Sequence, residues 1–381
     1  MTDATGRLSR RPPPPIPIVL LTGFLGAGKT TLLNTWVRSP AFADAAVVIN
    51  EFGDVSVDHL LVEQAEGTML TLSSGCLCCS VRGDLMEMLE DLIRRRDNGR
   101  VTPFNRLVIE TTGLADPGPV LNTIMAHPYL PLRYCIDAVA TVVDALHGAA
   151  TLADHPEARS QVAVADTLVV TKTDLVADLA DRDALLATLR DLNPAARRLD
   201  AAAGEATAEA VLEGGLHALG AGESRPRPWL APDSYAGGTA RGGHDHAHDH
   251  HAHGHDHHHG IAAICLTRDA PLDPTSFGLF LDLVRGTYGA KVLRIKGLVA
   301  LSDAPDRPRV IHGVQHFIHP AHQLAAWPDP DHRSRLVFIL DHLEPSVIAR
   351  TWDAFFGPPA PDRADAAGLM AGREPLGGLL G

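Results

Sequence analysis

The segment GFLGAGKT, residues 23–30, is the feature that most constrains how this chain can fold. It matches the pattern G-x-x-x-x-G-K-[ST], follows an apolar run typical of a strand, and continues into a helical pattern. A phosphate-binding loop requires this strand–loop–helix context, because main-chain N–H groups at a helix N-terminus must converge on phosphate oxygens. The sequence therefore predicts an α/β nucleotide-binding domain built around this loop.

The residues of this P-loop have separate predicted roles. Lys29 is expected to reach the β and γ phosphates of a nucleotide, and Thr30 is expected to bind magnesium. The main chain of the loop is expected to surround the phosphate oxygens. The predicted nucleotide-binding residues of the loop are Gly23, Gly26, Ala27, Gly28, Lys29, Thr30 and Thr31.

A second motif, VVTKTD, indicates which base is bound. Asp174 can accept hydrogen bonds from both the ring N–H and the exocyclic amine of guanine, a pair of donors that adenine does not present. The stem of Lys172 can lie along the base, and Thr171 stands where this motif usually has Asn. GTP is therefore predicted rather than ATP, while the loop-stabilising contact of the usual Asn is in question.

Acidic residues follow two further predicted strands. Glu110, in the segment LVIETTGLADP, is expected to hold magnesium through water, and Gly113 is expected to bring its N–H to the γ phosphate. Glu51 and Asp54, in INEFGDVSVDH, occupy the position of a switch loop. The sequence leaves open which of Glu51, Asp54 and Glu110 orients the attacking water, and whether Glu51 and Asp54 are only solvated acids.

Short β-branched runs alternate with amphipathic helical stretches from Ile16 to about Asp200, which predicts a parallel sheet covered by helices. The candidate strands are IPIVLLT, AAVVIN, LVIE, ATVVD and TLVVT. The predicted fold class is a P-loop NTPase α/β domain with a mainly parallel sheet, a His-rich linker, and a smaller α+β C-terminal domain. The predicted boundaries are 1–15 for a flexible arm, 16–202 for the nucleotide domain, 203–260 for the linker, 261–357 for the second domain and 358–381 for a flexible tail.

Three of the five cysteines, Cys76, Cys78 and Cys79, form a C-x-C-C motif just before a predicted helix. Three thiolates supply soft ligands for zinc, cobalt or copper(I), and a helix N-terminus favours the thiolate form. Redox chemistry is a weaker alternative, because adjacent cysteines do not easily form a disulfide, and inert packing is another. Cys135 and Cys265 stand alone in apolar surroundings and are predicted to be buried without a role.

Ten of the 21 histidines lie in one tract with three aspartates between them, which predicts weak loading of divalent ions, or a low-complexity segment without a role. The candidate ligands are His244, His246, His248, His250, His251, His253, His255, His257, His258 and His259. His312, His316, His319 and His322 have helical ligand spacing, but the alternation in VIHGVQHFI predicts a strand. A strand would hold His312 and His316 about 13 Å apart, too far to share a metal.

Composition excludes several classes of protein. The net charge of −13 argues against non-specific binding to nucleic acid or anionic lipid. No apolar run approaches the roughly 20 residues of a membrane span, and the first fifteen residues lack the apolar core of a secretory signal. With few cysteines and no export signal, a cytoplasmic location is expected.

The segments GFLGAGKTTLLN, NEFGD, SSGCLCCSVRGDL, ETTGLADP and TKTD, with an internal His-rich linker and the region from about residue 310 to 339, together resemble the CobW-type family of metal-handling GTPases. The resemblance extends from about Ile16 to Leu343. It implies a metallochaperone that captures a metal, most often zinc, on Cys76, Cys78 and Cys79 and transfers it to a client metalloenzyme when GTP is hydrolysed.

Alternatives to zinc transfer remain open. Some branches of the family deliver cobalt for cobalamin synthesis or support nitrile hydratase, although a longer insertion of the cobalamin-linked branch is absent here. Nickel insertion fits three thiols less well, and a metal buffer without coupled GTP hydrolysis would also explain the thiols and histidines. The client protein and any oligomeric state cannot be inferred from the sequence.

The predicted topology suggests how nucleotide and metal are coupled. The Cys loop and the NEFGD loop are both expected at the carboxyl edge of the parallel sheet, which is also the edge of the γ phosphate. Bound GTP is hypothesised to draw the switch segment in and complete the metal site, and hydrolysis to loosen it.

Overall fold

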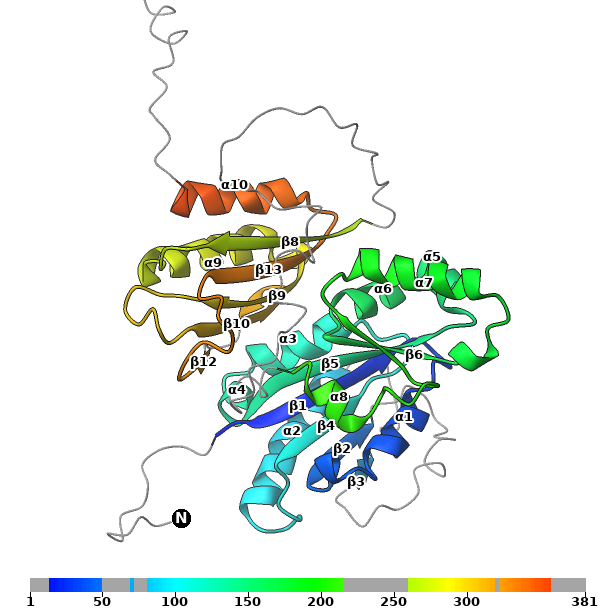
Figure 1. The fold of residues 1–381 in the computed structure, drawn as a ribbon. Coiled ribbons are helices and arrows are strands. Elements are labelled where there is room, and N and C mark those ends of the chain that lie inside the picture. The colour runs from blue at the N-terminus through cyan, green and yellow to red at the C-terminus, as the bar shows by residue number, and fades with distance from the viewer. Residues whose placement is uncertain (1–13, 50–68, 72–80, 216–259, 319–321, 358–381) are drawn as a thin grey trace, which may run out of the picture.

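Two β-sheets organise the chain in the computed structural model, which describes residues 14–49, 69–71, 81–215, 260–318 and 322–357 (Figure 1). The first sheet has seven strands in the order β3-β2-β4-β1-β5-β6-β7, and all its pairings are parallel. Its strands are β1 (Ile16–Gly23), β2 (Ala45–Ile49), β3 (Met69–Thr71), β4 (Arg106–Glu110), β5 (Tyr134–Asp144), β6 (Thr167–Thr171) and β7 (Arg197–Asp200).

All five predicted strands of this sheet form, and nearly every residue of the central strands is buried. This burial explains their continuous apolar runs, because helices cover both faces of the sheet. The prediction was incomplete in three places. β5 begins at Tyr134, and the sheet also contains β3 and β7. The segment of β7, RRLD, has no apolar run, since it lies at the edge of the sheet.

Helices pack on both faces of the first sheet, and the hydrophobic clusters assign each helix to a face. Trp36 of α1 and Val211 of α8 belong to the cluster on one face, and the other helices contribute to the cluster on the opposite face. The helices are α1 (Lys29–Trp36), α2 (Val81–Asp97), α3 (Pro117–Ala126), α4 (Leu130–Arg133), α5 (Gly148–Asp154), α6 (Pro156–Ala163), α7 (Leu179–Leu192) and α8 (Ala208–Leu212). The predicted helix after the Cys motif is therefore present as α2.

Helix α8 lies in a region that the sequence predicted to be linker. Thr207 caps the helix by accepting a hydrogen bond from the N–H of Ala210, and Ala208 and Val211 are buried. The Nε1–H of Trp36 also donates to the carbonyl of Ala206, at 2.9 Å. The first domain therefore extends beyond residue 202. Small apolar residues of this segment complete its core, although the Ala-rich composition of the segment predicted a linker.

The second sheet is antiparallel and lies beside two helices. Its order is β11-β10-β9-β13-β8, with β12 also paired to β10. Residues of both helices pack with one face of the sheet, and Figure 1 shows α10 on the side away from the first domain. The elements are β8 (Ile261–Arg268), α9 (Pro274–Tyr288), β9 (Val292–Val299), β10 (Arg309–Val314), β11 (Phe317–Ile318), β12 (His322–Gln323), β13 (Ser334–Asp341) and α10 (Pro345–Phe356). The predicted fold class is confirmed.

The other face of the second sheet packs on the first domain. Ile261, Leu293, Val314 and Ile339 of the second domain are part of the same hydrophobic cluster as the helices on one face of the first sheet. The apolar face of the second sheet is therefore buried by the first domain, which fixes the two domains to each other. Within the described residues, no helix combines the length and the apolar character of a membrane span.

A buried ion cluster lies at this interface between the domains. Asp166, at the start of β6, accepts hydrogen bonds from Arg294 at 2.7 and 2.8 Å and from Lys296 at 2.7 Å, and all three residues are buried. Burial would raise the pKa of Asp166, but the charges of Arg294 and Lys296 outweigh it and hold the pKa below its usual value. The ionised carboxylate therefore contributes stability above about pH 4, and that contribution is lost as the pH falls below this value.

We expect Asp166→Asn to lower the free energy of unfolding by about 3–5 kcal/mol, because it removes the buried carboxylate charge that both Arg294 and Lys296 contact. Urea denaturation of the full chain measures this change. Asp269→Asn is the matched control, because the Asp269 side chain is 91% exposed and lies 4.0 Å from Arg333. Its expected effect is within about 1 kcal/mol. Equal effects of the two substitutions would contradict the assignment of stability to the buried cluster.

Candidate functional site

The P-loop begins at Gly23, the last residue of β1, and ends at Thr30, the second residue of α1. Gly23, Gly26 and Gly28 have φ angles of 140°, 71° and 97°, which side chains rarely adopt. A Cβ atom at Gly23 would lie 2.3 Å from the carbonyl oxygen of Val142. Glycine is therefore required there both by backbone conformation and by the close approach of β5.

Lys29 and Thr30, for which the sequence predicts phosphate and magnesium binding, are the first two residues of α1. Lys29 is 8% exposed, and its Nζ donates to the carbonyls of Gly23 at 2.9 Å and Phe24 at 3.1 Å. The Thr30 hydroxyl donates to Oε1 of Glu110 at 2.9 Å. Thr30 and Glu110 thus offer an alcohol and a carboxylate oxygen at one point, a donor set that suits magnesium.

Thr171 and Lys172, in the segment predicted to read the base, donate hydrogen bonds to carbonyls of the P-loop. The Thr171 hydroxyl lies 2.7 Å from the carbonyl of Ala27, as donor, and 3.3 Å from that of Val143. The sequence put this contact in question because Thr replaces Asn, yet the shorter side chain reaches the loop. Lys172 has a left-handed φ of 59° and donates to the carbonyl of Gly26 at 2.9 Å. The predicted base-reading segment and the P-loop are therefore one hydrogen-bonded unit.

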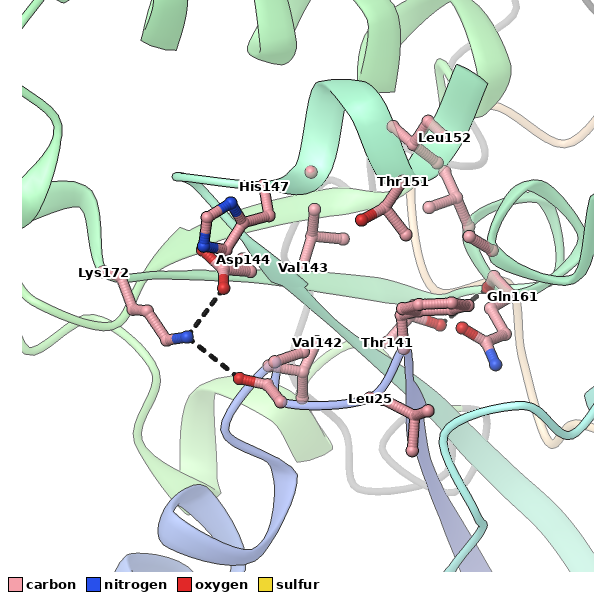
Figure 2. Close-up of a pocket in the computed structure, with 16 residues that line it drawn as sticks. Leu25, Thr141, Val142, Val143, Asp144, His147, Thr151, Leu152, Gln161 and Lys172 are labelled. Carbon is pink, nitrogen blue, oxygen red and sulfur yellow. Dashed lines mark hydrogen bonds and ion pairs between the residues drawn. The ribbon is translucent and has the colours of Figure 1, made fainter. Parts of the chain in front are cut away.

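Asp144, at the end of β5, completes this unit and was not predicted. Lys172 Nζ lies 2.6 Å from its Oδ2, and Figure 2 shows Lys172 between this carboxylate and the P-loop. Partial burial would raise the pKa of Asp144, but hydrogen bonds from Lys172 and the Leu146 N–H hold the pKa below its usual value. A carboxylate ending an apolar strand was the available sequence signal. Asp174, the predicted guanine acceptor, lies next to this unit in the 3₁₀ turn Thr173–Leu175.

A cavity of about 270 Å³ adjoins the P-loop on the side of α5 and α6. Figure 2 shows Lys172, Asp144 and His147 at one end of the cavity and Thr141 and Gln161 at the other. Lys29, Thr30 and Asp174 do not line it. Three of the predicted nucleotide-binding residues do line it, namely Gly26, Ala27 and Lys172, so the cavity adjoins the predicted site without containing all of it.

The loop after Glu110 lies directly against the P-loop. A Cβ atom at Gly113 would lie 2.6 Å from the main-chain nitrogen of Leu25 and 2.7 Å from its Cα, so no side chain fits at this position. The sequence singled out Gly113 for a γ-phosphate contact, and this close packing gives the same glycine a second requirement. Its predicted contact with the γ phosphate remains a prediction.

Several predicted residues lie outside the described part of the chain. These are Glu51, Asp54, Cys76, Cys78, Cys79 and the ten histidines from His244 to His259, so their roles remain predictions. Within the residues that are described, no group of three or more His, Cys, Asp or Glu side chains has the arrangement of a metal site. Of the two isolated thiols, Cys265 is buried and Cys135 half-buried, and burial raises the pKa of each to about 12.

The structure also answers part of the question about the row of histidines after residue 311. His312 lies in β10 as predicted, and it is buried. The strand ends at Val314, however, and Gln315 has a φ of 51°, so His316 lies in a turn rather than further along the strand. Its Nδ1 is 3.2 Å from the carbonyl of Arg285. The extended strand predicted between His312 and His316 was therefore wrong at its end.

The fold and this arrangement of loops define a P-loop nucleotide-binding protein with an attached α+β domain. The chain matches the family described as "CobW/HypB/UreG, nucleotide-binding domain" over residues 17–200 and "Cobalamin synthesis protein cobW C-terminal domain" over residues 261–356. The chain therefore belongs to the CobW/HypB/UreG family, and the predicted resemblance is confirmed.

Named relatives agree with this assignment. The chain is 32% identical to the zinc chaperone YjiA of Escherichia coli over 327 residues, which are 85% of this chain and 94% of YjiA. It is 37% identical over 173 residues to the zinc-regulated GTPase metalloprotein activator 1 of Schizosaccharomyces pombe, covering 44% of this chain and 41% of that protein. The structure of Zn(II)-bound YjiA GTPase from E. coli superimposes with a TM-score of 0.60 at 28% identity, covering 90% of this chain and 99% of that one. The chain is accordingly a GTPase of this family.

We expect Thr171→Val to weaken GDP binding about tenfold, because it removes the hydroxyl that anchors the carbonyl of Ala27 while keeping the shape of the side chain. Thr171→Ser keeps the hydroxyl and is expected to bind GDP within about threefold of the unaltered chain. Titration with a fluorescent GDP analogue measures both. If valine and serine bind GDP equally well, the hydroxyl contact does not support the loop.

Proposed function

We propose that this protein is a GTP-dependent metallochaperone that binds zinc at Cys76, Cys78 and Cys79 and transfers it to a client metalloprotein upon GTP hydrolysis. Membership of the CobW/HypB/UreG family supports the proposal, as do relatives named zinc chaperone and zinc-regulated GTPase metalloprotein activator. The C-x-C-C motif supplies three soft ligands, which suit zinc.

One observation carries the coupling of nucleotide to metal. Glu110 pairs with Ile49 of β2, and Ile49 pairs with Thr71 of β3, so the three residues form one row across the sheet. The segment that contains the cysteines begins directly after Thr71, and the segment with Glu51 and Asp54 begins directly after Ile49. With strands about 4.8 Å apart, both segments leave the sheet within about 10 Å of Glu110.

GTP hydrolysis uses residues of loops that lie on the other side of Glu110 from β2 and β3. Lys29 binds the β and γ phosphates, Gly26, Ala27 and Gly28 hold phosphate oxygens through their main chain, and Gly113 donates to the γ phosphate. Thr30 and, through water, Glu110 would hold magnesium, and the ion would supply positive charge beside the phosphates. One of Glu51, Asp54 and Glu110 orients the attacking water. Asp174 and Lys172 select guanine.

The proposal links metal release to the γ phosphate. With GTP bound, the segment of Glu51 and Asp54 is drawn in and completes the metal site. When the γ phosphate leaves, that segment is released and the metal is held less tightly. The tract from His244 to His259 loads ions weakly and raises their local concentration.

We expect Asp174→Asn to lower GTP affinity about 100-fold and to permit binding of xanthosine triphosphate, because an amide can donate to the oxygen that replaces the guanine amine. Competition titrations with both nucleotides measure this exchange. Asp178→Asn is the control, since Asp178 is exposed and caps α7. A variant that loses GTP without gaining the xanthine nucleotide would argue against base reading by Asp174.

We expect the full chain to bind zinc at least tenfold more tightly with a non-hydrolysable GTP analogue than with GDP, because the analogue completes the metal site. Competition with a chelator measures zinc and cobalt affinity in both states. Cys78→Ala is expected to remove the difference, and Lys29→Ala is expected to remove it together with GTP turnover.

Cys135→Ser is the matched control, because it removes a thiol outside the motif. It should retain the difference between the two nucleotide states. Equal zinc affinity with both nucleotides in the unaltered chain would overturn coupled transfer and favour a metal buffer that shares a chain with a GTPase.

A further inference from the structure

The loop from Thr111 to Asp116 connects Glu110 to α3, and its first residue is held by β1. The N–H of Thr111 donates to the carbonyl of Leu21 at 2.9 Å, and its hydroxyl lies 2.8 Å from that of Thr22. Gly113 then packs against Leu25 of the P-loop. One side of this loop is therefore fixed by the strand and loop that carry the phosphate site.

Gln161 of α6 holds the other side of the same loop. Its Nε2 donates to the carbonyls of Gly113 at 3.1 Å and Ala115 at 2.9 Å, and the residue is 1% exposed. The main-chain carbonyl of Gln161 accepts a hydrogen bond from the Thr141 hydroxyl at 2.7 Å. Both N–H donors of one buried amide thus serve the main chain of the loop.

The support of Gln161 is itself rigid. Asn193, at the end of α7, donates from Nδ2 to the carbonyls of Val162, Ala163 and Ala165 at 2.9, 3.0 and 2.9 Å. The C-terminal end of α6 is therefore fixed one residue beyond Gln161. Because these hydrogen bonds hold the end of α6 in place, the side chain of Gln161 can define the position of the loop.

We infer that Gln161 is a positioning residue for GTP hydrolysis: by holding the carbonyls of Gly113 and Ala115, it keeps the loop after Glu110 in the position from which Gly113 meets the terminal phosphate. This inference rests on the proposed contact of Gly113 with that phosphate. Gly113 lacks a side chain, so its conformation is restrained only by its neighbours. Leu25 restrains it from one side, and the amide of Gln161 restrains its carbonyl from the other.

The position of the loop matters more to the chemical step than to binding. Affinity for the nucleotide comes from the P-loop and the base-reading segment, and Gln161 contacts neither of these through its amide. A displacement of the loop by about 1 Å is enough to slow a chemical step by up to about 100-fold. Loss of the amide should therefore lower kcat and leave KM nearly unchanged.

The test compares GTP hydrolysis by the full chain with that of Gln161→Met, which keeps the volume of the side chain but has no donors. We expect kcat to fall about 10- to 100-fold, while KM for GTP and the affinity for GDP change less than about threefold. Gln161→Glu keeps the shape and replaces the donors with acceptors, and it is expected to lower kcat at least as much. Gln161→Glu provides the same test if Gln161→Met does not fold.

Tyr134→Phe is the matched control for the loss of a buried hydrogen bond. Tyr134 is the first residue of β5, at the amino edge of the sheet, opposite the edge that carries the P-loop. Its hydroxyl donates to the carbonyl of Leu89 at 3.1 Å. Tyr134→Phe is expected to lower the melting temperature and to leave kcat per folded molecule unchanged. Turnover that persists at the normal kcat in both Gln161 variants, or that falls only through KM, would overturn the inference alone. Absence of GTP hydrolysis in the unaltered chain would overturn the proposed function together with it.

Discussion

The hydrogen bonds that hold the P-loop from outside are the interactions on which the rest of the site depends. Lys172 binds the carbonyl of Gly26, and Thr171 binds the carbonyl of Ala27. A trans peptide holds its C=O and N–H in opposite directions, so the anchor on Ala27 directs the N–H of Gly28 to the other side of the loop. The segment predicted to read the base therefore also orients the main chain of the P-loop.

The loop after Glu110 links the P-loop to packed elements of both domains. It begins beside Thr30, passes between Leu25 and Gln161, and continues as α3. The start of α3 then meets the β10–β11 turn of the second domain, where a Cβ atom at Gly118 would lie 2.9 Å from the amide of Gln315. The buried cluster around Asp166 fixes the same two domains at a second place. Because protein interiors are close-packed, a displacement of this loop would be transmitted to the elements of both domains that pack around it.

The parallel sheet explains how the proposed metal-binding loop and the P-loop can begin close together. Glu110 pairs with Ile49, and Ile49 with Thr71, so β4, β2 and β3 end in register, while β1, whose Leu21 pairs with Glu110, continues to Gly23. Every connection that leaves the carboxyl ends of these strands starts at the same edge. The short distance between the points where the two loops leave the sheet is therefore a property of strand register and does not depend on their separation in sequence.

The sequence by itself determined the parts with strong local signals. The motif GFLGAGKT, the five apolar strands and Glu110 were readable because a P-loop needs its glycines and a sheet buried on both faces needs continuous apolar runs. Only the tertiary structure decided the contacts between distant residues. It showed that Thr171 can replace Asn, that Asp144 holds Lys172, and that Gln161 holds the loop of Gly113. It also assigned α8 to the core. Each of these depends on which segments meet in space, and a single polar residue in an otherwise ordinary helix or strand carries no local pattern that reveals its partner.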